Sequence, residues 1–329
     1  MAHPKFEILI PAAVAASIAL GIAVVTAGCG SRTQSTGSAD RSVDTSQAVA
    51  GNTPQPQRPE QKSGETRSVQ PQVETEIGKA EAAKRATLLK DAQSALEETR
   101  MALAALDRGD SKAALAALAS ASGKLDLVVS RDPNLALAPV SVDTVVYDLY
   151  ATPDAVKTVV KQVRGDLSDD RIQQARRELQ YLASEADVNV TELPIASYPA
   201  AIKAVAPLID HGHVDEAKAA LSAALDSLVI DTLVIPLPRV RAEALLGEAQ
   251  QLTSKNNRTQ ADQDKARTLI AAARNEVQLA EALGYGSKAD YKPLYSEMDD
   301  LEKAAQSGNA GSGLFDRVRQ SLKRFKFSV

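Results

Sequence analysis

The sequence predicts a mainly α-helical protein, a bundle of helical hairpins with a small β element of two or three strands. Between about residues 73 and 306, apolar residues recur at three- and four-residue spacing, with Ala as the commonest small residue, which is helical periodicity. Three segments interrupt this pattern and are rich in Val, Ile and Thr between Pro, Asp and Asn: 140–147, 188–193 and 228–235. Such composition is typical of strands.

The ends of several helices are marked by single residues. A long first helix should end at Gly109, because glycine accepts the left-handed conformation that caps many helices. Thr152 followed by Pro153 predicts a helix start, since Thr caps and Pro suits the first turn. Pro207 should kink or shorten its helix. One face of the first helix is formed by Leu88, Leu89, Ala92, Leu96, Thr99, Leu103 and Leu106.

An internal repeat supports the hairpin interpretation. Residues 109–121 (GDSKAALAALASA) match residues 212–224 (GHVDEAKAALSAA), and a weaker third copy runs from Asp170 through Ala175 and Leu179. Each copy predicts the turn and second helix of a helical hairpin, with Ala allowing close helix approach. The unequal spacing of the copies excludes a solenoid, so we expect the hairpins to share one bundle.

Composition excludes several classes of function. The 329 residues carry 38 Lys and Arg against 42 Asp and Glu, only 3% aromatic residues, three His and one Cys. A nucleic-acid binder is disfavoured, and neither a disulfide framework nor a Cys/His zinc cage can form. Carboxylate pairs such as Glu97 with Glu98 are adjacent on a helix, so they diverge by about 100°. We therefore predict no enzyme, no catalytic residue and no cofactor.

The N-terminus carries an export or anchoring segment. Residues 8–28 are uncharged and mostly apolar, and they lead to Cys29 through Thr26, Ala27 and Gly28. This ending resembles the lipobox of bacterial lipoproteins, which implies cleavage before Cys29 and lipidation of its thiol. The alternative is an uncleaved single membrane span. Both place the remaining chain outside the cytoplasm, and Gly30 favours the outer membrane or periplasmic face.

A flexible tether is expected to follow. From residue 31 to about residue 72 the chain is rich in Ser, Thr, Gln, Pro, Gly and charge, and cannot bury enough apolar surface to offset its ordering entropy. The resulting organisation is a signal peptide, a lipidated Cys with its tether, an α-rich domain, additional helices, and a Gly/Ser linker with a basic helix: 1–28, 29–72, 73–254, 255–307 and 308–329.

The C-terminal segment 314–329 predicts a basic amphipathic helix. Its apolar stripe comprises Leu314, Val318, Leu322, Phe325 and Val329. Its basic residues are Arg317, Arg319, Lys323, Arg324 and Lys326. Such helices adsorb to anionic membranes, which would give the chain a second membrane contact besides Cys29. The alternative is a final helix that packs on the bundle or pairs in an oligomer.

Two His residues form the one His cluster that follows Cys29. His211 and His213 stand among Asp210 and Asp215, so they could bind a divalent metal or titrate between about pH 5 and 8. The repeat supplies the alternative, because Arg108 occupies the position of His211 in the other copy. An ordinary solvated turn accepts any polar residue there, and we commit to no metal site.

Three Tyr residues lie beside the predicted strands and turns. Tyr147, Tyr150 and Tyr198 are candidates for lining a ligand or peptide groove. The alternative is that they are partly buried core residues whose hydroxyls are hydrogen-bonded.

Three segments in succession carry a family resemblance. They are KLDLVVSRDPNLALAPVSVDTVVYDLYA (124–151), LPIASYPAAIKAVAPLIDHGHVDEAKAAL (193–221) and LVIDTLVIPLPRVRAEALLGEAQ (228–250). These resemble the YfdX family of bacterial envelope proteins, over roughly residues 83–252. The resemblance implies an exported, helical, oligomeric protein linked to envelope stress such as acid, with a chaperone-like role and no established catalytic residues.

These observations predict a non-enzymatic, lipid-anchored protein of the cell envelope with a chaperone-like or acid-stress-protective role. Its expected partners are membrane lipid, further copies of itself and unfolded or partner envelope proteins, with no nucleic acid. One alternative is a membrane-tethered scaffolding lipoprotein that binds a partner protein. Another is a small-molecule or metal binder that uses the His turn or the Tyr residues.

Overall fold

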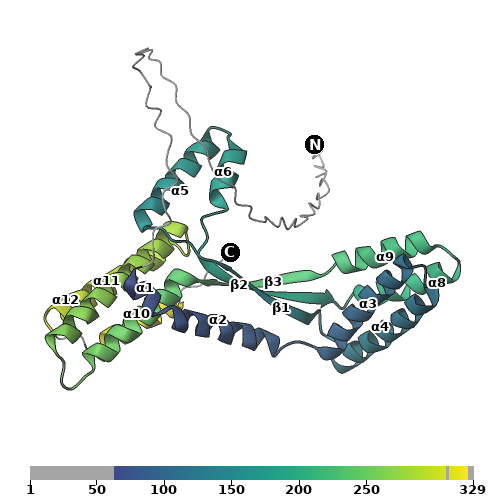
Figure 1. Ribbon diagram of the computed structural model, residues 1–329, viewed down its shortest axis with the longest axis horizontal. Helices are drawn as coiled ribbons and strands as arrows, with labels where there is room; N and C mark the ends of the chain where they lie inside the picture. The colour runs from purple at the N-terminus through teal and green to yellow at the C-terminus, as the bar shows by residue number, and fades with distance from the viewer. Residues whose placement is uncertain (1–62, 309–310, 325–329) are drawn as a thin grey trace, which may run out of the picture. The chain divides into compact units, whose positions relative to one another are not determined.

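The computed structural model describes residues 63–308 and 311–324. The predicted signal segment, Cys29 and most of the tether lie outside these residues, as do Phe325, Lys326 and Val329. All described residues belong to one unit of the chain, Gln55–Val329. The chain is mainly helical with a small sheet, as predicted (Figure 1).

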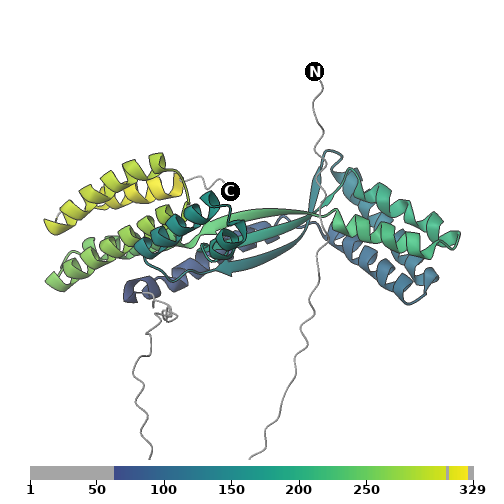
Figure 2. The ribbon, with the colours of Figure 1, turned by 90° about the horizontal axis from the view of Figure 1, so that it is seen from above.

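The elements follow one another in this order (Figures 1 and 2): α1 Gly64–Ser68, α2 Gln70–Arg85, α3 Lys90–Asp107, α4 Ser111–Arg131, β1 Leu137–Tyr147, α5 Pro153–Ser168, α6 Ile172–Leu179, β2 Glu185–Pro194, α7 Tyr198–Lys203, α8 Val205–Asp210, α9 Val214–Asp226, β3 Val229–Pro236, α10 Leu237–Thr253, α11 Gln260–Leu283, α12 Lys288–Gln306 and α13 Ser312–Arg324.

The three predicted strands form one antiparallel sheet in the order β1-β2-β3. In the register, Val188 of β2 faces Thr144 on β1 and Leu233 on β3. Side chains alternate between the two faces of a strand, so Ala186, Val188 and Val190 share one face of the central strand and are buried. Helix α2 contacts β1 and β2, and its Val73 packs with these residues in one hydrophobic cluster.

Helices α3, α4, α7, α8 and α9 share a second hydrophobic cluster. Many of its buried positions are Ala, including Ala95, Ala102, Ala114 and Ala217, and such small side chains let helix backbones approach closely. Helix α4 is long and apolar enough to cross a membrane by length and composition alone. Within the described residues no other helix meets that test. The face of α4 that carries Ala114, Leu118 and Leu125 is buried in this cluster.

The repeat corresponds to two hairpin turns of the same geometry. Gly109 and Gly212 both have positive φ, 75° and 78°. After Gly109, the N–H of Asp110 donates to the carbonyl of Ala105 at 2.9 Å, and after Gly212 the N–H of His213 donates to Leu208 at 2.8 Å. These hydrogen bonds are those of the Schellman motif, which ends many helices at a glycine of positive φ. The hairpin prediction is confirmed for both copies.

The third copy also forms a hairpin, α5 with α6, but the expectation of one common bundle is wrong. Asp170 takes the left-handed position, with φ 57°, and the N–H of Arg171 donates back to Asp166 at 2.8 Å. The hairpin contacts α11 and lies outside the three hydrophobic clusters. The turn geometry is local and repeats, whereas the partner of a hairpin depends on side chains that differ between copies.

Helices α10 to α13 form the third hydrophobic cluster, and two predicted boundaries are corrected here. Leu245 and Leu246 of α10 pack in one core with Leu269 of α11 and Leu294 of α12. The boundary predicted at 254/255 therefore divides a single core. The predicted tether also ends too late, because α1 and the first residues of α2 are helical and Val69 is buried in this cluster.

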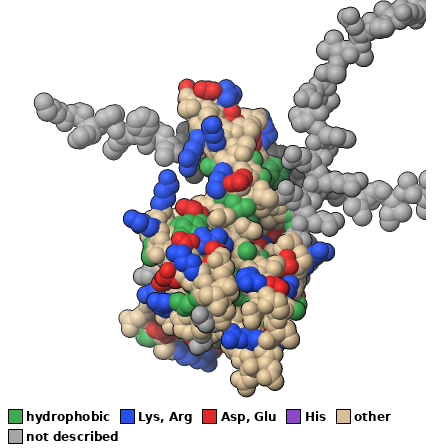
Figure 3. Space-filling view, turned by 90° about the vertical axis from the view of Figure 1, so that its left-hand side faces the viewer, with side chains coloured by type: hydrophobic (Ala, Val, Ile, Leu, Met, Phe, Trp, Pro, Cys, Tyr) green, Lys and Arg blue, Asp and Glu red, His purple; other side chains and the backbone are tan. Residues whose placement is uncertain are grey.

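The outer surface of the helices around this third cluster carries charges of both signs. Figure 3 shows Lys and Arg side chains interspersed with Asp and Glu on one face of the molecule. Among the ion pairs is that of Arg274 on α11 with Glu302 on α12, whose Nε and Oε1 atoms lie 2.6 Å apart. Arg274 also pairs with Asp299, so one guanidinium joins two neighbouring helices.

We predict that Gly109→Ala destabilises the protein by about 1–2 kcal/mol, because an L-residue pays that amount in the left-handed region. No atom would clash with the added Cβ, so the cost is conformational. Gly123→Ala is the matched control, since Gly123 is exposed within α4 and should gain about 0.5–1 kcal/mol. Urea unfolding of both variants checks the two opposite signs, and two equal signs would contradict this account.

Candidate functional site

The predicted His cluster lies on the exposed turn between α8 and α9. The Nδ1 of His211 is 2.6 Å from the carbonyl oxygen of Pro207, and the Nδ1 of His213 is 2.7 Å from Glu216 Oε2. Each imidazole thus has a partner in its own hairpin. In the part of the chain that the structure describes, no group of three His, Cys, Asp or Glu side chains could hold a metal ion. The pH-sensing and metal hypotheses for His211, His213, Asp210 and Asp215 stay predictions.

The three Tyr residues do not line one groove. Tyr198, at the start of α7, is fully buried in the cluster of α3, α4 and α7 to α9. Burial raises the pKa of its hydroxyl. Tyr147 ends β1 and Tyr150 follows it, and both are exposed by almost half. The sequence placed all three beside strands or turns, but which side chain enters a core depends on the helices packed above it.

The basic C-terminal helix, α13, packs on the preceding helices through its apolar stripe. Phe315, Val318 and Leu322 of α13 are buried against α10 and α12. This is the packing alternative that the sequence left open, and it leaves the apolar stripe of the described helix unavailable to a membrane. Arg317, Lys323 and Arg324 stay exposed, and Arg319 Nη1 donates to Gln250 Oε1 at 3.2 Å. Lys326 lies outside the described residues.

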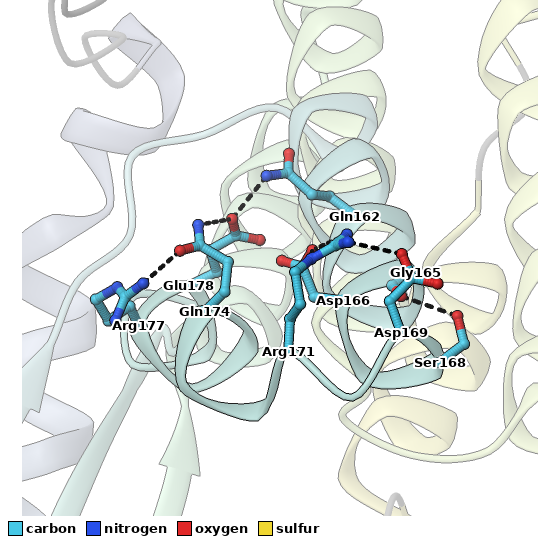
Figure 4. A network of polar contacts seen from close by, with 9 residues as sticks. All are labelled: Gln162, Gly165, Asp166, Ser168, Asp169, Arg171, Gln174, Arg177 and Glu178. Carbon is cyan, nitrogen blue, oxygen red and sulfur yellow. Dashed lines mark hydrogen bonds and ion pairs between the residues drawn. The ribbon is translucent and has the colours of Figure 1, made fainter.

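The α5–α6 hairpin, residues 153–181, is the candidate site, and a polar network joins its two helices (Figure 4). Asp166 of α5 is buried, and its Oδ1 accepts from the Nε and Nη2 of Arg171 at 3.0 and 2.7 Å. Glu178 of α6 accepts from Gln162 at 2.6 Å and from Gln174 at 3.1 Å. The hairpin is therefore held closed largely by charged and amide groups.

The same hairpin exposes large apolar side chains. Ile172 and Tyr181 are 59% and 70% exposed, and Leu167 and Leu179 are also exposed. Its buried apolar residues are few: Val156, Val163 and Ala175. Exposed apolar groups gathered on one element are typical of protein interaction surfaces. The sequence did not single out these residues, although the third repeat copy contained Ala175 and Leu179.

Comparison with known proteins identifies the region that contains this hairpin. Residues 95–234 match the model of the YfdX protein family. The chain carries a YfdX domain. This region spans α3 to β3 almost completely, so the α5–α6 hairpin lies within it, between strands β1 and β2. Helices α10 to α13, which share their own core, follow the matched region.

A solved structure of YfdX from Salmonella Typhi is similar over 46% of this chain and 93% of its own length, with 16% identity and a TM-score of 0.33. None of the curated protein sequences matches the chain.

Carboxylates of the YfdX sheet and of the later helices have pKa values that are shifted in opposite directions. Burial raises the pKa of Asp187 on β2, with a further contribution from Glu185, and burial raises the pKa of Glu243 on α10 against the opposing charge of Arg239. At the start of α11, the hydrogen bond from Lys255 and those from Thr259 lower the pKa of Asp262 to about 2. The α11 cap therefore keeps its charge at pH 4.

We predict that Asp166→Asn loosens the hairpin. The neutral amide loses the charge that holds Arg171, so amide hydrogen exchange in α6 should rise by about tenfold or more while exchange in α3 and α10 stays unchanged. Asp154→Asn is the control, because that exposed carboxylate pairs with Lys157 within α5 and not across the hairpin in the described structure. Unchanged exchange in α6 of the Asp166 variant would show that the ion pair does not hold the hairpin.

We predict that Asp187→Asn stabilises the protein at neutral pH. A carboxylate whose folded pKa is raised destabilises the folded state when ionised, and this penalty vanishes as pH falls below its ordinary pKa of about 3.9. Asp187 Oδ1 is buried without a hydrogen-bond partner in the described structure. Urea unfolding should show a gain at pH 7 and none at pH 3. Asp143→Asn, whose carboxylate accepts from Asn189, should show no such gain.

Proposed function

We propose that this protein is a non-enzymatic, lipid-anchored protein of the cell envelope that binds unfolded proteins under stress, in the manner of a chaperone. The observation that carries the proposal is the exposed apolar surface of the α5–α6 hairpin within the YfdX domain. This surface comprises Leu167, Ile172, Leu179 and Tyr181.

The surface suits unfolded chains because it combines apolar contact area with charge. Side chains that remain exposed on a folded domain gain free energy when another apolar surface covers them. Arg171, Arg176 and Arg177 lie on the same helix or immediately before it. Arginine is common in interfaces because its planar head hydrogen-bonds while its stem packs on apolar groups. The hairpin therefore offers both kinds of contact to a client.

Anchoring in the envelope rests on the N-terminal sequence. The segment 8–28 and Cys29 support an exported, lipidated chain. An exported protein of this kind meets unfolded envelope proteins where no cytoplasmic chaperone acts. Acid tolerance is supported by Asp187 and Glu243, whose raised pKa values mean that protonation relieves an unfavourable charge in the folded state.

The test measures aggregation of an unfolded client protein in the presence of the purified full-length chain, at pH 4 and at pH 7. We expect suppression at sub-equimolar protein. A double variant, Ile172→Ser with Tyr181→Ser, should need about tenfold more protein for the same suppression, because a few central apolar side chains carry most of an interface's binding energy. Both residues are exposed, so the variant should fold.

The matched control is Met101→Ser with Leu127→Ser, which removes two exposed apolar side chains from α3 and α4. This variant should suppress aggregation like the unaltered protein. Full aggregation with the unaltered protein at both pH values would overturn the chaperone proposal and leave the scaffolding alternative. Equal losses in both double variants would show that the hairpin is not the binding surface.

A further inference from the structure

A pocket of about 570 Å³ lies beside the hairpin but is built mostly from other elements. Its walls come from the start of α1, the β1–α5 connection, and helices α10 and α11, including Thr66, Tyr150, Arg241, Ala271 and Glu276. Its volume is within the range of small-molecule sites. Helices α1, α10 and α11 lie outside the region that matches the YfdX family. The pocket is therefore a feature of the whole unit and not of the YfdX domain alone.

A buried guanidinium forms part of this pocket. Arg241 is 1% exposed, and its Nη2 donates to Asp148 Oδ1 at 2.7 Å. Its Nε has no hydrogen-bond partner among the described residues. A buried donor without an acceptor costs free energy, and such groups are few in folded proteins. The oxygen atom of a bound ligand would satisfy this donor.

The remaining charges of the pocket are negative. Glu276, only 8% exposed, accepts from Thr66 Oγ1 at 3.1 Å. Glu65 and Asp154 also line the pocket, and they pair with Lys265 and Lys157. The pocket thus combines one guanidinium paired with Asp148, the buried carboxylate of Glu276, and two carboxylates that have lysine partners. A simple anion would be repelled by the buried carboxylate of Glu276, and a simple cation would leave Arg241 Nε without an acceptor.

The pocket also has an apolar wall. Leu149, Ala151, Pro153, Ala271 and Leu279 line it together with the ring of Tyr150. A ligand that fits all three features has an acceptor oxygen, a positive group and a short apolar part between them. We propose that this pocket binds a small zwitterion with one carboxylate and one ammonium group, of the size of an amino acid or a dipeptide.

Isothermal titration of the full-length protein tests this inference with four probes. Dialanine carries both charges, N-acetyl-dialanine carries only the carboxylate, dialanine amide carries only the ammonium, and alanine is the shorter zwitterion. We expect dialanine or alanine to bind at least about tenfold more tightly than either singly charged form. Their relative affinities distinguish a peptide from a free amino acid. No heat with either zwitterion, or equal affinity for the blocked forms, would overturn the proposal.

Substitutions locate the binding in this pocket. Arg241→Met and Glu276→Gln should each weaken zwitterion binding about tenfold or more. Glu281→Gln is the control on the same helix, because Glu281 accepts from Tyr295 and does not line the pocket. Unchanged binding in the Glu276 variant would contradict the assigned site.

A blocking variant keeps the test decisive should the buried substitutions impair folding. Ala271 is exposed on α11 and lines the pocket, so Ala271→Phe should abolish binding without disturbing the core. Ala261→Phe, at an exposed position of the same helix outside the pocket, should bind like the unaltered protein. Binding that survives Ala271→Phe would place the ligand elsewhere. Client suppression is expected to persist in this variant, so the two proposals fail or stand separately.

Discussion

The antiparallel pairing of β1, β2 and β3 is the constraint on which the rest of the structure depends. The first residues of β1, Ala138 and Val140, belong to the core of the Ala-rich hairpins, whereas Val142 belongs to the core under α2. Helix α10 begins directly where β3 ends, and it contacts β2 and β3. Strands that serve two cores cannot slip in register, because a shift of one residue would turn each buried side chain to the opposite face.

The α5–α6 hairpin between β1 and β2 is stabilised by different interactions from those of the three hydrophobic cores. The α5–α6 hairpin buries Val163 and Ala175 but relies on the pair of Asp166 with Arg171 and on the amide contacts of Glu178. Polar contacts at a surface contribute less net stability than apolar burial, so such an element opens more easily than a core helix. An element of low local stability that also exposes apolar side chains suits a role in binding other proteins.

The helices that follow the YfdX domain contribute to a pocket and to a hydrophobic core. By packing α11 against α10 and α5, they form one side of a pocket whose lining comes from both parts of the sequence. Asp154 and Tyr150 belong to the YfdX domain, and Arg241 and Glu276 belong to the added helices. Helices α10 and α12 also cover the apolar stripe of α13, which includes Phe315 and Val318. The same packing thus removes one candidate membrane surface and creates one candidate ligand site.

The sequence by itself determined the local structure. Helical periodicity, Val- and Thr-rich segments and single glycines depend on residues close in the chain, and they predicted the strands and the hairpin turns at Gly109 and Gly212. The resemblance of three sequence segments to the YfdX family agrees with the family match over residues 95–234. The tertiary structure alone decided what each face contacts. Tyr198 lies in a core, Tyr150 lines a pocket, and α13 packs on α10. These contacts join segments that are distant in the sequence, and periodicity does not show which distant segments contact each other.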